Sequence, residues 1–156
     1  MANRVRITDR DKGWKALMRR AQKAARGRAV TVGVHSGEGG APAGGGSLSV
    51  ADVATIHEYG LGNSPERSFV RAFADEKRDE ANEVEAKLVG AAIMGKGGSI
   101  DDALERFGTW LVGMMQKRIR AGIQPGNAPA TEAAKGSSTP LIDTGQLVSS
   151  ITYKVE

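Results

Sequence analysis

The chain has 156 residues, of which 40% are hydrophobic and only 4% aromatic, a composition that fits one domain with a thin core. It contains no cysteine, which excludes a disulfide framework and any zinc or thiol site built from cysteine. The net charge is +4, but residues 1–28 hold ten Lys and Arg against two Asp, so a basic N-terminal end precedes a mildly acidic body. No apolar run approaches the roughly 18 residues of a membrane span, so we expect a soluble protein.

The first third of the chain shows strand and helix patterns in turn. Alternating apolar and basic residues predict a short strand over residues 4–7, and an amphipathic helix follows over residues 11–26. Residues 29–35 place three valines on one face and predict the clearest strand. A glycine-rich stretch over residues 36–48 predicts a flexible loop.

A short helix and two long ones are expected next. The short helix runs from Ser49 to about Tyr59 and is stopped by Gly60. The first long helix is predicted over residues 66–95. The second is predicted over residues 99–122, where Ser99 is the expected N-cap with Asp102 at the third helical position.

The end of the chain completes the expected fold. Residues 123–142 lose all periodicity and contain three prolines, which predicts an extended arm. Residues 151–155 alternate as a half-buried strand that should pair with residues 29–35. We therefore predict a single α+β domain over residues 1–156, in which two long helices pack on one face of a small antiparallel sheet and residues 36–48 and 123–142 form loop arms.

One segment raises the possibility of an enzyme. Residues 140–145 read PLIDTG, and an apolar pair before Asp-Thr-Gly is typical of an aspartic protease half-site. Such a protease needs a long β-rich chain after the Asp, whereas only 11 residues follow Gly145. The alternative interpretation of this segment is a turn or a helix cap.

Two further motifs each lack a required residue. Residues 90–97 approach a phosphate-binding loop, but Gly97 stands where that loop needs a hydroxyl residue. His57-Glu58 begins a zinc-protease pattern, but Leu61 stands where the second histidine is required. We therefore predict no enzyme, and no catalytic, cofactor-binding or metal-binding residue.

Three blocks of sequence point instead to a structural role. Residues 50–60 read VADVATIHEYG, residues 65–71 read PERSFVR, and residues 140–151 read PLIDTGQLVSSI. In their order and spacing these blocks resemble the neck and tail-completion proteins of long-tailed bacteriophages. In that family an apolar helix ends in Glu-aromatic-Gly, a Pro-x-Arg-Pro-Phe segment starts a long helix, and a Pro-Leu-Ile/Val-Asp-Thr-Gly block precedes the last strand. The chain departs from the family at Ser68, where a second proline is usual.

The resemblance implies a virion protein without catalysis that forms a ring at the head–tail junction and is assembled in the bacterial host cytoplasm. Its implied partners are further copies of itself, the head-completion, adaptor or portal proteins, and the tail terminator or tail tube proteins. Arg67 and Arg71 lie one turn apart at the expected start of the first long helix. They are predicted to pair with acids across a subunit boundary or to lie on a solvated face. The candidate subunit-interface or structural residues are His57, Glu58, Tyr59, Gly60, Pro65, Arg67, Phe69, Arg71, Pro140, Asp143, Thr144, Gly145 and Leu147.

The basic N-terminal helix leaves several hypotheses open. In a ring it would line a channel through which double-stranded DNA passes, or it would dock on an acidic neighbour. In a protein of another class, a stand-alone nucleic-acid-binding protein or an assembly factor absent from the mature particle, it would bind DNA in a salt-sensitive manner. A solvated helix face is the remaining alternative. The candidate DNA or acidic-partner contacts are Lys15, Arg19, Arg20, Lys23 and Arg26.

Overall fold

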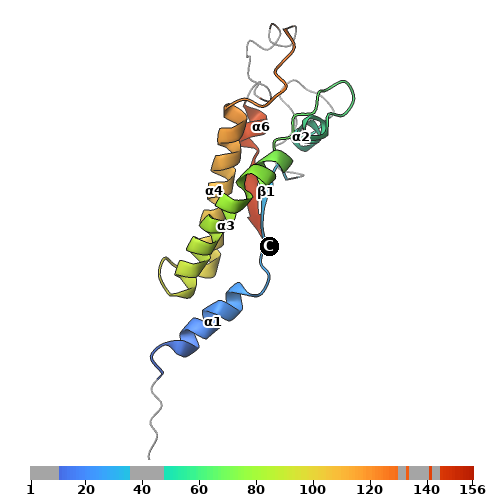
Figure 1. The fold of residues 1–156 in the computed structure, drawn as a ribbon. Helices are drawn as coiled ribbons and strands as arrows, with labels where there is room; N and C mark the ends of the chain where they lie inside the picture. Colours follow the sequence, from blue (N-terminus) through green and yellow to red (C-terminus); the bar gives the residue numbers. More distant parts are fainter. Residues whose placement is uncertain (1–10, 36–47, 130–132, 134–140, 142–144) are drawn as a thin grey trace, which may run out of the picture.

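The computed structural model describes residues 11–35, 48–129, 133, 141 and 145–156. Its elements, shown in Figure 1, are α1 (Trp14–Ala24), β1 (Val30–Gly33), α2 (Val50–Tyr59), α3 (Arg71–Ile93), α4 (Ile100–Arg120), α6 (Gln146–Ser149) and β2 (Thr152–Val155). The strand expected over residues 4–7, nearly all of the expected loop 36–48 and much of the expected arm 123–142 lie outside the described residues.

The two described strands form one antiparallel pair, as the sequence predicts. The register joins Val30 to Val155 and Gly33 to Thr152. Ala29 and Glu156 extend the ladder by exchanging two backbone hydrogen bonds of 3.1 and 2.9 Å. Backbone hydrogen bonds therefore hold the segment after α1 against the last strand of the chain.

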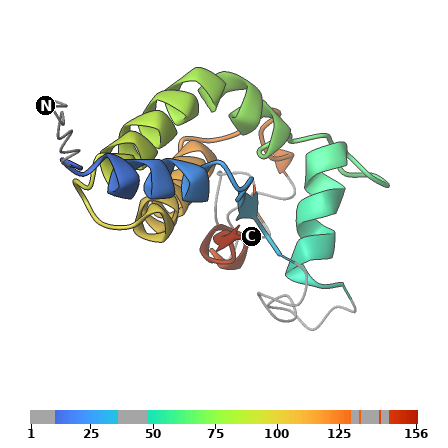
Figure 2. The same cartoon turned by 90° about the horizontal axis from the view of Figure 1, so that it is seen from below.

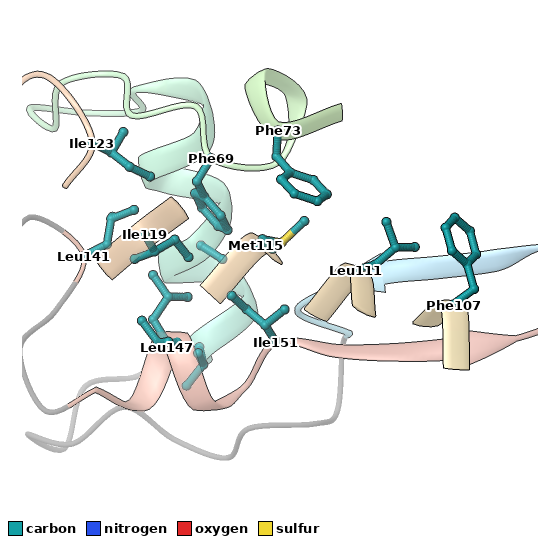
Figure 3. Close-up of a cluster of buried hydrophobic side chains, with 13 residues drawn as sticks. Phe69, Phe73, Phe107, Leu111, Met115, Ile119, Ile123, Leu141, Leu147 and Ile151 are labelled. Atoms are coloured by element: carbon teal, nitrogen blue, oxygen red, sulfur yellow. The ribbon is translucent and has the colours of Figure 1, made fainter. Parts of the chain in front are cut away.

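The long helices α3 and α4 lie along each other, and α4 also contacts both strands (Figures 1 and 2). Their apolar positions recur at helical spacing, so each helix presents one apolar side. The predicted α+β class, with two long helices packed beside a small antiparallel sheet, is confirmed. The main cluster of buried side chains comprises Val50, Ala54, Phe69, Phe73, Phe107, Leu111, Met115, Ile119, Ile123, Leu141, Leu147, Val148 and Ile151, most of which Figure 3 labels.

Both α2 and α4 begin with a reciprocal cap between a Ser and the Asp three residues later; the sequence predicts this cap for α4, and for α2 it gives only the start at Ser49. Asp52 N–H and Asp102 N–H donate to the hydroxyl oxygens of Ser49 and Ser99, and each Asp carboxylate accepts from the N–H of its serine. This reciprocal pair satisfies two of the N–H groups that the first turn of a helix leaves without a partner. In both caps these hydrogen bonds hold the pKa of the Asp carboxyl below its ordinary value.

The start of α3 and the segment before β2 differ from the prediction. Helix α3 begins at Arg71 rather than at residue 66, because the backbone N–H groups of residues 69–71 bind the carboxylate of Glu58. Between Gly145 and β2 the chain forms the short helix α6, which was not among the elements expected from the sequence. This helix turns Leu147 and Val148 into the core.

Candidate functional site

The centre of the candidate site is a carboxylate buried between α2 and α3. Glu58, near the end of α2, is 5% exposed. Its Oε2 accepts the backbone N–H of Phe69 at 2.7 Å and of Val70 at 2.9 Å. Its Oε1 accepts the backbone N–H and the Nε–H of Arg71 at 2.9 and 3.1 Å. The carboxylate therefore accepts the N–H of the first residue of α3, of its N-cap Val70 and of Phe69 before the cap.

This arrangement favours the ionised form of Glu58. Burial alone would raise the pKa of its carboxyl, but the hydrogen bonds from Val70, Arg71 and Phe69 outweigh burial and hold the pKa below its ordinary value. The side chain of Val70, which stands at the N-cap of α3, has no oxygen to accept these N–H groups. Glu58 therefore caps α3, although it lies on another helix.

Ser68 also takes part in this cap. Its hydroxyl donates to Glu58 Oε1 at 2.9 Å and accepts the N–H of Ala72 at 3.3 Å. The sequence marked this position only as a departure from the family's usual proline, so its role was missed. A serine shortly before a helix is the signal that could have identified it.

Arg71 connects the buried carboxylate to the surface. Its Nη2 donates to the backbone carbonyl of Glu58 and to the carboxylate of Glu66, both at 2.7 Å. Its guanidinium lies over the ring of Tyr59, 4.6 Å from the ring centre. The hydrogen bonds to Glu58 and Glu66 raise the pKa of Arg71.

Arg67 does not lie on a helix, contrary to the prediction. It is 6% exposed, and its Nε and Nη2 donate to the backbone carbonyls of Pro125 and Gly126 at 2.8 and 2.9 Å. Its own N–H donates to the carbonyl of His57 at 2.7 Å. A planar guanidinium suits two neighbouring carbonyls. Arg67 therefore ties the end of α2 to the segment that follows α4.

The remaining residues of the first two blocks shape the turn between α2 and α3. Gly60 has φ 65°, and a Cβ there would lie 2.7 Å from the backbone nitrogen of Glu66. Pro65 is exposed, whereas the ring of Phe69 is only 1% exposed. Glycine is required at residue 60 both by its left-handed backbone and by the close approach of the chain.

The third block meets the other two in the core. Leu141 and Leu147 are 6% and 7% exposed and belong to the same buried cluster as Phe69 (Figure 3). Gly145, with φ 77°, precedes the first residue of α6. The side-chain amide of Gln116 on α4 donates to the carbonyl of Val148 at 3.1 Å. Pro140, Asp143 and Thr144 lie outside the described residues.

The basic candidate residues lie apart from Glu58 and the residues that bind its carboxylate. Lys15, Arg19, Arg20 and Lys23 are on α1, and Arg26 follows it. Lys23 pairs with Asp101 at the start of α4, and so does Arg28, which the sequence analysis did not select. These contacts hold the pKa of Asp101 below its ordinary value, with the hydrogen bond from Lys23 as the main cause.

Among the described residues, no group of three or more His, Asp or Glu side chains is arranged to hold a metal ion. No helix in the described part of the chain is long and apolar enough to cross a membrane.

The structure is that of an α+β protein in which the buried carboxylate of Glu58 joins the end of α2 to the start of α3. Comparisons with protein-family models, with curated proteins and with solved structures gave no match.

Proposed function

We propose that this chain is a structural protein of a tailed-phage virion that forms a ring at the head–tail junction. In this role, called neck or tail completion, it joins the head-completion or portal side to the tail terminator and tail tube. The observation that carries the proposal is the convergence of the three resemblance blocks. Glu58, Phe69 and Leu147 each come from a different block, and all three lie at the junction of α2, α3 and α6.

A structural role agrees with the chemistry of that junction. Glu58 accepts hydrogen bonds on both oxygens from donors of its own chain. A carboxylate held in this way is a poor proton donor or nucleophile, because its ionised form is stabilised and surrounded. It is well suited to fix the angle between two helices, as a ring subunit requires.

Exposed residues at the end of α2 offer a surface to neighbouring subunits. Tyr59 and Leu61 are 55% and 49% exposed. Beside Tyr59 lies a hollow of about 360 Å³, lined in part by Val34, Ala51 and Val70. Exposed aromatic and aliphatic groups beside a hollow are typical of protein contact sites.

The decisive experiment locates the chain in particles. Tailed particles from the source would be purified, the chain identified in them by mass spectrometry, and gold-labelled antibody imaged by electron microscopy. We expect label at the head–tail junction. Label on the tail tip or capsid, or absence of the chain from mature particles, would reject the neck role.

The basic N-terminal region supports one alternative. Residues 12–28 contain seven basic residues and no acidic residue, a pattern that also fits contact with DNA phosphates. A DNA-binding or assembly-factor protein that leaves before maturation would bind DNA as an isolated chain, with an affinity that falls steeply as salt rises. Absence from mature particles together with such binding would favour this alternative.

A further inference from the structure

Helix α1 contacts α3 and α4, and Ala24 near its end packs against a buried cluster, but apolar side chains near its start stay exposed. None of the residues Trp14–Ala24 is buried, although their apolar and basic side chains are strongly segregated. Trp14 and Met18 are 65% and 38% exposed. A helix of 11 residues is marginally stable in water on its own. Such a helix normally gains its stability by packing its apolar side against another surface.

The chemistry of α1 restricts what this other surface can be. A carboxylate already binds near its C-terminal end, because Asp101 pairs with Lys23 in the last turn and with Arg28 beyond the helix. Lys15 and Arg19 lie one turn apart, are exposed, and make no ion pair with any described residue. A fitting partner therefore offers carboxylates beside a surface that accepts Trp14 and Met18.

Helix α3 offers such carboxylates. Residues 75–85 hold six acidic residues and two basic ones. Asp75, Asp79 and Glu83 are spaced four residues apart, so they lie on one side of the helix, and all three are exposed. We call these three residues the acidic face. Asp79 and Glu83 have no ion-pair partner among the described residues.

The two surfaces belong to different parts of the same chain. Helix α1 lies near the C-terminal end of α3, where the Arg20 guanidinium approaches Gly95. The acidic face runs from the second turn of α3 to just past the middle of the helix, so it lies away from the end that α1 approaches. A contact between α1 of one copy and the acidic face of another would join unlike surfaces. Contacts of this kind generate rings when the rotation closes.

We propose that α1 of one copy binds the acidic face of α3 in a second copy. This inference refines the ring contact and rests on the proposed function only for its setting in the virion. The exposed Trp14 and Met18 favour a protein surface over DNA, because phosphate contacts do not require an apolar side.

Charge reversal on the full-length chain tests the contact. The first variant carries Lys15→Glu and Arg19→Glu, the second carries Asp79→Lys and Glu83→Lys, and the third combines all four changes. Self-association is measured by sedimentation velocity. Each double reversal should weaken association by about tenfold or more, and the fourfold variant should return to within about threefold of the wild type, because reversing both sides restores opposite charges. Glu85→Lys, on another side of α3, is the matched control and should change association little.

Cross-linking supplies a second measurement. The chain has no cysteine, so introduced thiols are the only ones present. Chains carrying Arg19→Cys should form disulfide-linked dimers with chains carrying Asp79→Cys. Chains carrying Thr109→Cys, an exposed position on α4, serve as the control and should not cross-link to Arg19→Cys chains.

Three outcomes would overturn the proposal. The first is a wild-type chain that stays monomeric at its solubility limit and forms no cross-link. The second is a fourfold variant that associates no better than the double reversals. The third is salt-sensitive binding of a DNA duplex that the Lys15→Glu and Arg19→Glu variant loses while its self-association is unchanged, which would assign α1 to DNA. These readouts use purified chain, so they fail or succeed independently of where the protein lies in the particle.

Discussion

Glu58 and Phe69 are joined by a hydrogen bond of 2.7 Å from the Phe69 N–H to the Glu58 carboxylate. The ring of Phe69 is 1% exposed and lies in the main core with Met115 and Ile119 (Figure 3). The position of this ring therefore depends on a charge 11 residues earlier in the chain. Through this bond the cap of α3 and the packing of the core become one structural unit.

Replacing Glu58 with alanine should destabilise the fold strongly. The change leaves the N–H groups of Phe69, Val70 and Arg71 without their acceptor, and leaving a buried donor unsatisfied costs about 1–3 kcal/mol. We expect the free energy of unfolding, measured by urea denaturation, to fall by this amount. The matched control is Glu66→Ala, which removes an exposed partner of the same Arg71. Equal losses in the two variants would show that the buried carboxylate has no special role.

The stability contributed by Glu58 should depend on pH in one direction. Its pKa in the folded chain lies below the ordinary value of 4.5, because backbone hydrogen bonds outweigh burial. A lowered folded pKa means that the contribution is complete above the unfolded pKa and is lost as pH falls through the folded pKa. Asp52, Asp101 and Asp102 shift in the same direction, so the wild type alone does not isolate Glu58.

Comparing the stability of the wild type with that of Glu58→Gln isolates the contribution of Glu58. We expect the difference in unfolding free energy to be constant from about pH 6 to pH 7 and to shrink steadily below about pH 4.5. Urea denaturation at half-unit steps of pH would measure it. A difference that grows as the solution becomes more acidic would contradict the assigned direction of the pKa shift.

Gly60 and Gly62 form a matched pair for testing the turn between α2 and α3. Both have left-handed backbones, with φ 65° and 66°, but only at Gly60 would a Cβ meet another residue, 2.7 Å from the nitrogen of Glu66. Gly62→Ala should cost about 1 kcal/mol for the backbone alone. Gly60→Ala should cost about 1–3 kcal/mol more, because the chain near Glu66 must move. Similar melting temperatures for the two variants would refute the steric part of this argument.

The sequence was enough to predict a helix cap or a strand wherever the residues that determine it lie close together in the chain. The cap predicted at Ser99 depends on an Asp three residues later, and it is present. The valine alternation around residue 32 predicted β1 and its pairing with the last strand. Such patterns reflect the geometry of one helix or strand and do not depend on the rest of the fold.

The sequence was not enough to predict a feature that depends on a contact with residues far away in the chain. The start of α3 is set by Glu58, which lies 13 residues before Arg71 and on another helix. Arg67 bonds carbonyls 58 and 59 residues away, at Pro125 and Gly126. A cation at an expected helix start gives no hint of carbonyl partners elsewhere. The exposed position of α1 likewise follows from packing, because its apolar pattern alone fits either a core or an interface helix.

A last prediction concerns the contact between the sheet and α4. At Gly108 a Cβ would lie 2.2 Å from the ring of Tyr153 on β2, whereas at Gly113, on the same helix, no described atom lies within 4 Å. Gly113→Ala should raise stability by about 0.5–1 kcal/mol, because alanine favours the helix. Gly108→Ala gains the same helix preference but forces Tyr153 away from α4, so its net effect should be a loss of about 1–3 kcal/mol.

Thermal unfolding of Gly113→Ala and Gly108→Ala would measure these opposite changes in stability. The hydroxyl of Tyr153 donates to the carboxylate of Glu105, so a displaced ring also loses this bond. Tyr153→Leu in the Gly108→Ala background should therefore recover part of the loss, because a shorter side chain leaves room for the added methyl group. If Gly108→Ala is as stable as Gly113→Ala, then β2 does not pack on α4 as closely as the structure places it.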